Sequence, residues 1–190
     1  MQIGQADETG QALLLRLVAV KDKQALGELY DQVASALFAI SVRILGDRHE
    51  AEEVIQDVFV EIWNKASTFD ATLGTPVHWA MRIARNRSID RLRSRQRRAQ
   101  MLDRLQEFTP ADSTGGAVSQ STGLVADELA RIRAAVNSLP PNQRRALEMA
   151  FFNGQTHAEI ALSTGEPLGT VKARIRRAMV KLRDTLQDYA

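Results

Sequence analysis

Residues 156–178 read THAEIALSTGEPLGTVKARIRRA, and they contain the clearest structural signal in the C-terminal half of the chain. Thr156 and Glu159 form the pattern of a capping box, which starts a short helix. Gly165 then provides a turn, and Val171 and Ile175 recur at a four-residue step that places them on the inner side of a second helix. A short helix, a glycine turn and a longer helix are the layout of a helix-turn-helix.

The second helix of this motif is strongly basic. A helix of such charge can contact phosphates and base edges together when it lies in a major groove. A helical hairpin with a solvated basic face is the simpler alternative, but spacing, turn and charge coincide here, so the sequence favours DNA binding. The cations that precede its first acid, Asp184, are Lys172, Arg174, Arg176, Arg177, Lys181 and Arg183.

The sequence on either side of this motif predicts an all-α chain of two small helical domains joined by a flexible linker. The C-terminal domain, expected over residues 127–190, places two further helices before the motif, separated by Pro140-Pro141. The linker is expected over 101–126, because PADSTGGAVSQSTG at 110–123 has few large apolar groups and no periodicity.

The N-terminal domain is expected over residues 11–100. Apolar residues between 26 and 45 recur at three- and four-residue steps, and Gly46 follows as a stop signal. Residues 67–74 read as a loop, after which Thr75-Pro76 has the form of an N-cap followed by proline in the first turn.

Composition narrows the possible functions. The chain of 190 residues has no cysteine, and its three histidines lack companions at metal-ligand spacing, so we expect neither a metal nor a cofactor. No nucleotide-binding loop, nucleophile elbow or carboxylate pair is present, so we expect no enzyme activity. With no signal peptide or membrane-spanning run, we expect a cytoplasmic protein that does not insert into membranes.

The net charge of +2 conceals a strong segregation of charge. Residues 82–98 hold eight arginines against Asp90, a local charge of +7. Residues 47–61 hold six acids against Arg48, a local charge of −5. This polarity suggests two different partners, one anionic and one basic.

Neither charged helix decides its own function. The helix that carries the arginine run also presents Trp79, Asn86 and Asp90. From the residues alone, specific base reading and nonspecific binding remain equally open. For the acidic helix, a solvated face is the simpler interpretation, although a valine among carboxylates would fit a docking surface. The residues that share its outward side by spacing are Glu53, Gln56, Asp57, Val60, Glu61 and Asn64.

Three segments resemble, in the same order, those of the extracytoplasmic-function sigma factors of the sigma-70 family. AEEVIQDVFVEIWNKASTFD at 51–70 resembles the polymerase-docking segment. TPVHWAMRIARNRSIDRLRSRQRR at 75–98 resembles the segment that opens the strands and reads the −10 element. Residues 138–183 resemble the domain that reads the −35 element.

The resemblance implies a function in promoter-specific transcription initiation, with core RNA polymerase (clamp helices and flap), promoter DNA and an anti-sigma factor as partners. It implies that Glu53, Gln56, Asp57 and Val60 bind polymerase. It implies that Asn86 captures a flipped −10 base within a pocket that the loop 67–75 helps to form. The further −10 residues are Trp79, Arg85, Asp90 and Arg93, and the −35 residues are Lys172, Ala173, Arg174, Arg176 and Arg177.

Two departures and two alternatives qualify these expectations. Ala173 stands where the family commonly has a small polar residue, so its methyl group could touch a thymine but donates no hydrogen bond. The middle of the capture loop, DATLGT at 70–75, is variable in character and leaves the preferred base open. A free-standing helix-turn-helix repressor or activator would leave the acidic helix unexplained, and a recombinase or nuclease would need a catalytic centre.

Overall fold

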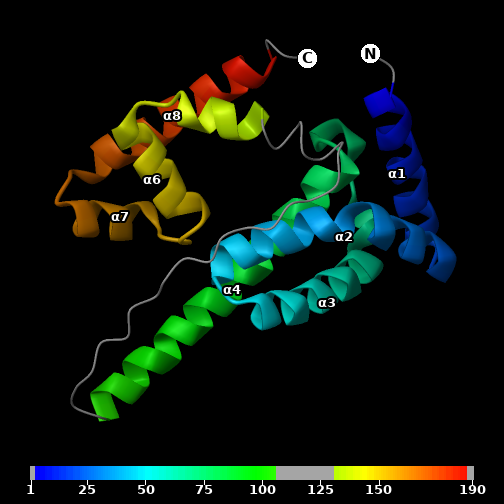
Figure 1. Ribbon diagram of the computed structural model, residues 1–190, viewed down its shortest axis with the longest axis horizontal. Coiled ribbons are helices and arrows are strands. Elements are labelled where there is room, and N and C mark those ends of the chain that lie inside the picture. The colour runs from blue at the N-terminus through cyan, green and yellow to red at the C-terminus, as the bar shows by residue number, and fades with distance from the viewer. Residues whose placement is uncertain (1–2, 106–130, 188–190) are drawn as a thin grey trace. The chain divides into compact units, whose positions relative to one another are not determined.

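The computed structural model describes residues 3–105 and 131–187 and divides the chain into two compact units, residues 1–118 and 119–190 (Figure 1). Across these described ranges all regular structure is helical, which confirms the predicted all-α class. None of the helices described is both long enough and apolar enough to span a membrane.

Within residues 3–105 the N-terminal unit has four α-helices: α1 (Ile3–Ala19), α2 (Lys23–Leu45), α3 (Arg48–Lys65) and α4 (Pro76–Leu105). Helix α2 packs against α1, α3 and α4, and α3 also packs against α4. Between α3 and α4 the predicted loop contains two short 3₁₀ turns, η1 (Ala66–Thr68) and η2 (Ala71–Leu73).

Local side chains set the ends of these helices. The Asp22 carboxylate accepts hydrogen bonds from the Gln24 and Ala25 N–H groups and caps α2. At the other end Gly46, with φ 69°, adopts the left-handed conformation that only glycine reaches without strain. Asp47 then caps α3 by accepting from the Glu50 N–H, and this hydrogen bond lowers the pKa of the Asp47 carboxyl.

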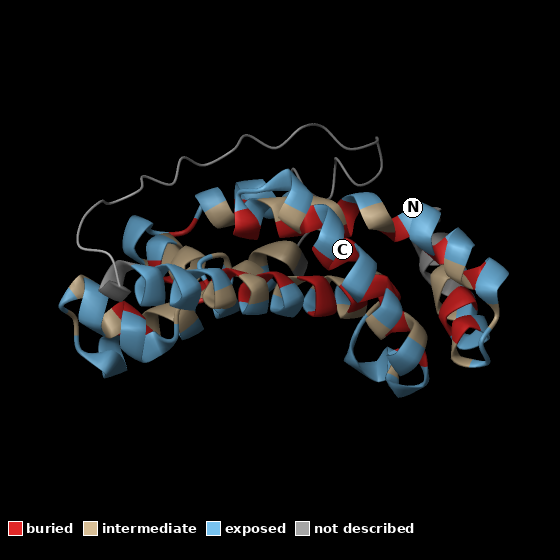
Figure 2. Cartoon of the chain, turned by 90° about the horizontal axis from the view of Figure 1, so that it is seen from below, coloured by how far each residue is buried: buried red, intermediate tan, exposed pale blue. Residues whose placement is uncertain are grey.

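The core of this unit is aliphatic, as the low aromatic content predicts. Buried residues form stripes on the inner sides of the helices (Figure 2). Leu15, Leu37, Leu45 and Ile62 are among the largest of its fully buried side chains. The last described turns of α4 differ, because residues 95–102 are all exposed.

The described part of the C-terminal unit, residues 131–187, contains a helical segment at 131–137 followed by α6 (Pro141–Phe151), α7 (His157–Thr164) and α8 (Leu168–Gln187). Both α6 and α7 pack on α8. The capping box at Thr156 and Glu159 is present, and Gly165 ends α7 with φ 69°, so the predicted helix-turn-helix is confirmed. The buried apolar residues are Ala135, Leu139, Ala146, Ile160, Val171 and Ala178.

Several details differ from the expectations. Helix α1 begins at Ile3, before the expected start of the first block at residue 11. Helix α4 continues through residue 100 to Leu105, because its polar sequence contains no stop signal there. Ile175, expected on the inner side of α8, is only half-buried. The remainder of the predicted linker, 106–126, lies outside the described residues.

Candidate functional site: the charged faces of α3, α4 and α8

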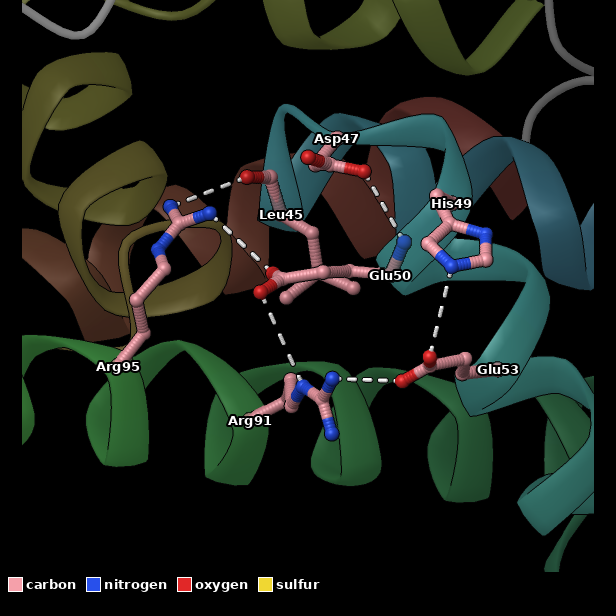
Figure 3. A network of polar contacts seen from close by, with 7 residues as sticks. All are labelled: Leu45, Asp47, His49, Glu50, Glu53, Arg91 and Arg95. Atoms are coloured by element: carbon pink, nitrogen blue, oxygen red, sulfur yellow. Dashed lines mark hydrogen bonds and ion pairs between the residues drawn. The ribbon is translucent and has the colours of Figure 1, made fainter.

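A ladder of ion pairs joins α3 to α4, which we call the α3–α4 ladder (Figure 3). Arg91 Nη2 lies 2.6 Å from Glu53 Oε2, and Arg91 Nε lies 3.9 Å from Glu50 Oε1. Arg95 Nη1 contacts Glu50 Oε2 at 3.2 Å. Outside the close-up, Arg87 Nε lies 2.5 Å from Glu61 Oε2.

The ladder shows that the two charged helices are also partners of each other. Three of the eight arginines in the basic run, at positions 87, 91 and 95, are paired with acids of α3. Arg95 also donates from Nη2 to the Leu45 carbonyl oxygen at 3.1 Å. Much of the opposite charge is therefore used to hold the two helices together.

Glu61 is the most enclosed acid of the α3–α4 ladder. Its side chain is 14% exposed and also accepts from Lys65 Nζ at 2.6 Å. Burial raises the pKa of Glu61, but the hydrogen bonds from Lys65 and Arg87 outweigh it and hold the pKa below its ordinary value. The sequence grouped Glu61 with the outward face of α3, and this grouping is wrong because Glu61 faces Arg87 of α4.

The four predicted polymerase-binding residues lie on an outward surface of α3, which we call the docking face. Gln56 and Asp57 are exposed, and neither forms an ion pair with any residue that the structure describes. Val60 beside them is 61% exposed, an unusual position for a valine on an acidic helix. Glu53 borders this face, and its carboxylate contacts both His49 and Arg91. The docking face consists of Glu53, Gln56, Asp57 and Val60.

Helix α4 presents an outer face away from the α3–α4 ladder. Asn86 and Asp90 are exposed, while Trp79 and Arg93 are half-buried. Together with the exposed Arg82 they recur at three- and four-residue steps, so they share one side of the helix. A shallow hollow beside this face is lined by Glu61, Arg82, Ile83, Asn86, Arg87 and Asp90. The outer face consists of Trp79, Arg82, Asn86, Asp90 and Arg93.

Arg85, the fifth predicted −10 residue, lies at the edge of this face and is half-buried. Burial lowers the pKa of its guanidinium, and the positive charge of Arg93 lowers it further. Its Nη1 contacts Asn86 Oδ1 at 3.4 Å. Arg85 therefore lies beside Asn86 but is offset from the exposed stripe.

The segment between α3 and α4 is anchored on α4 by an aromatic contact. The rings of Phe69 and Trp79 meet edge to face with their centroids 6.0 Å apart. Asp70 then accepts hydrogen bonds from the N–H and the hydroxyl of Thr72, which lower its pKa and shape the turn. Leu73 at the tip is 79% exposed.

The four basic residues in the first half of α8 differ in their exposure. The exposed side carries Lys172, Arg176 and Arg177 around the half-buried Ala173, and we call these four residues the recognition face. Arg174 lies at its border with a side-chain exposure of 23% and pairs with Glu166 from the preceding turn.

Sequence reasoning missed the partners inside the structure. Arg87, Arg91 and Arg95 recur every four residues, which is a signal for one side of a helix. It does not identify the acids that this side faces. Glu166 carried no signal, because its partner Arg174 lies eight positions later across a turn.

Two family models match the chain. The model described as Sigma-70 region 2 matches residues 29–98, which contain most of α2, all of α3 and the described part of α4 up to residue 98. The model described as Sigma-70, region 4 matches residues 129–182, which contain α6, α7 and most of α8.

Curated relatives match over most of their length. The chain is 32% identical over 173 residues to the ECF RNA polymerase sigma factor SigK of Mycobacterium ulcerans (strain Agy99), covering 91% of each chain. It is 32% identical over 175 residues to SigK of Mycobacterium tuberculosis (strain H37Rv), again with 91% coverage of each.

Two solved structures are similar to the chain. One is Rhodobacter sphaeroides SigE in complex with the anti-sigma ChrR, at 30% identity and a TM-score of 0.45, covering 93% of this chain and 98% of that one. The other is the sigma factor RpoE in complex with the anti-sigma factor NepR from Bartonella quintana, at 25% identity and a TM-score of 0.41, covering 85% and 96%.

Proposed function

The chain belongs to the extracytoplasmic-function group of the sigma-70 family, and we propose that it directs transcription initiation through three separate surfaces. The docking face of α3 binds core RNA polymerase, the outer face of α4 binds the −10 element, and the recognition face of α8 binds the −35 element. The observation that carries this division is the α3–α4 ladder. In the ladder Arg87, Arg91 and Arg95 of α4 pair with acids of α3, whereas Asn86 lies on an outward face of α4.

The docking face suits a basic helical partner. Its centre is Val60, flanked by Gln56 and Asp57, so an apolar contact is surrounded by groups that accept hydrogen bonds. Carboxylates at the rim speed association and fix orientation more than they add affinity. We place the clamp helices of the largest polymerase subunit here, and the flap against the C-terminal domain.

The outer face of α4 suits an unpaired base. Asn86 offers a donor and an acceptor to a base edge, and the exposed Arg82 on the same side can neutralise a phosphate. Unstacking a base costs a few kcal/mol, which capture of that base and phosphate contacts offset, so opening requires no hydrolysis and the protein need not be an enzyme.

The recognition face of α8 suits duplex DNA. Lys172, Arg176 and Arg177 are exposed on the second helix of a helix-turn-helix, where side chains reach both phosphates and base edges. We propose domains at 11–100 and 127–190, joined by a linker within 101–126 whose first residues continue α4 to Leu105. Two modest interfaces on one chain then bind as a single bivalent reader.

Control by an anti-sigma factor fits the same surfaces, since a protein that covers the docking face would block polymerase. The site of action is the cytoplasm, where polymerase and promoter DNA are found. Within the described residues no group of three or more metal-binding side chains is present, and the proposal requires no cofactor.

Run-off transcription with core polymerase on a random-promoter pool tests the proposal. The purified chain should bind core polymerase and select promoters with defined −10 and −35 sequences. Asn86→Ala should weaken opening at −10 more than binding to a −35 duplex, and Arg176→Ala should do the reverse. Gln32→Ala, an exposed amide on α2, is the matched control.

Binding to a duplex operator without affinity for polymerase would instead support the repressor alternative. Equal losses in both assays for Asn86→Ala and Arg176→Ala would refute the division of roles. Cleavage of DNA by the purified chain would support the nuclease alternative.

A further inference from the structure

The ion pair between Glu166 and Arg174 connects the turn of the helix-turn-helix to the second helix. Arg174 Nη1 donates to both carboxylate oxygens of Glu166, at 2.6 Å to Oε1. The two side chains are only 23% and 29% exposed, so water screens this pair less than a fully exposed one.

Glu166 is itself held in place by the backbone. Gly165 takes the left-handed conformation that ends α7, and the Glu166 N–H donates to the Ala161 carbonyl at 3.1 Å. Pro167 follows and restricts the backbone further. The carboxylate therefore projects from a fixed point in the turn after α7 toward a side chain of α8.

A guanidinium has five N–H donors in a rigid plane. Glu166 engages Nη1, and within the described residues neither Nε nor Nη2 of Arg174 donates a hydrogen bond. Two donors on one edge match the O6 and N7 acceptors of a guanine in the major groove. An arginine whose orientation is already fixed loses less side-chain freedom when it makes that contact.

We propose that Glu166 is a specificity-determining positioning residue, which holds Arg174 with its Nε–Nη2 edge presented to one base pair of the −35 element. This inference rests on the proposed −35 function of α8. The same carboxylate partly neutralises Arg174 and withholds it from phosphates, which lowers binding to DNA of other sequences. Glu166 thus acts through Arg174 and does not touch DNA itself.

The two effects predict opposite changes in Glu166→Gln, which keeps the shape of the side chain and removes its charge. Discrimination at the base pair read by Arg174 should fall by roughly three- to tenfold, a part of what a bidentate contact provides. Binding to duplex without a −35 element should rise, and its salt dependence should steepen by about one phosphate contact.

The test uses holoenzyme assembled from the full chain and core polymerase, with promoters substituted singly at every −35 position. The variants are Glu166→Gln, Arg174→Ala and the double variant, with Asp184→Asn as a control that removes an exposed charge elsewhere on α8. If Glu166 acts through Arg174, Glu166→Gln causes no further loss once Arg174 is alanine. Thermal unfolding of each variant separates positioning from folding.

The outcomes distinguish a failure of the −35 function of Arg174 from a failure of the positioning role of Glu166. If Arg174→Ala leaves every −35 preference intact, the proposed −35 function of Arg174 is wrong. If Arg174→Ala loses one preference and Glu166→Gln keeps it, the positioning proposal is overturned. A uniform loss at all positions in Glu166→Gln, with a lower unfolding temperature, would also overturn it, since the pair would then only stabilise the fold.

Discussion

Replacing Glu61 by glutamine measures how much the α3–α4 ladder stabilises the N-terminal unit. Glutamine preserves the size of the side chain but cannot form ion pairs with Arg87 and Lys65. A hydrogen bond to a charged group contributes about 1.5–3 kcal/mol when both groups are shielded. Lys65 and Arg87 are 57% and 47% exposed, so each pair is worth much less, at most about 1 kcal/mol.

The expected loss in the free energy of unfolding is therefore at most about 2 kcal/mol, and each kcal/mol lowers the unfolding temperature of a unit of this size by roughly 4–8 °C. Urea unfolding followed by tryptophan fluorescence gives the measurement. The chain has two tryptophans, Trp63 and Trp79, and both lie in the N-terminal unit, so the signal reports on that unit alone.

The pH dependence provides a second reading of the same change. Because the folded-state pKa of Glu61 is below its ordinary value of 4.5, its charge stabilises the fold fully above that value. The contribution is lost as the pH falls through the lower, folded-state pKa. The difference between wild type and Glu61→Gln should therefore be full near neutral pH and shrink in acid.

Glu52→Gln is the matched control. Glu52 forms a single pair with Arg48, four residues away on the same helix, and the two side chains are 51% and 74% exposed. We expect a change of less than about 0.5 kcal/mol for it. A Glu61→Gln effect no larger than this control would contradict the stabilising role of the Glu61 ion pairs. An undiminished effect at about pH 2 would contradict it as well.

Three further substitutions test the helices that support these faces. Ile160→Ala should destabilise the C-terminal unit by about 2–5 kcal/mol, because Ile160 is 1% exposed. Urea unfolding followed by far-ultraviolet circular dichroism measures this change, and a loss under about 1 kcal/mol would contradict the place of Ile160 in the core. Thr156→Ala should cost about 1 kcal/mol in the same assay through loss of the capping box, and unchanged stability would show that the cap is dispensable. Gly46→Ala should cost about 1–2 kcal/mol by tryptophan fluorescence, since alanine at φ 69° is strained although nothing blocks its methyl group; a neutral result would mean that the chain relaxes there.

Much of the fold could be predicted because its signals are local. A capping box needs two side chains three residues apart, and Thr156 with Glu159 supply it in sequence order. Thr75 likewise accepts from the His78 N–H at 3.3 Å, as its place before Pro76 predicts. Such hydrogen bonds join residues that are close in sequence and do not depend on how the helices pack, so they can be predicted from the sequence.

The charged surfaces were predicted less well because pairing between helices depends on how the helices pack. Helical spacing grouped Glu61 with Asp57 and Val60, but the packing of α4 against α3 encloses Glu61 and leaves the other two exposed. The exposure of Val60 was predicted and is confirmed. The promoter contacts of Asn86 and of α8 remain predictions.

The bond from Arg95 to the Leu45 carbonyl has a consequence for how the N-terminal unit opens. The last carbonyls of a helix have no partner within it, and the Gly46 N–H reaches only that of Val42, at 2.8 Å. Arg95, fifty residues later, supplies a donor and a positive charge at this negative helix end, at 3.1 Å. Fraying of the last turn of α2 is therefore coupled to the separation of α4 from α2. The amide hydrogens on both sides of this contact should therefore exchange with solvent as one cooperative group.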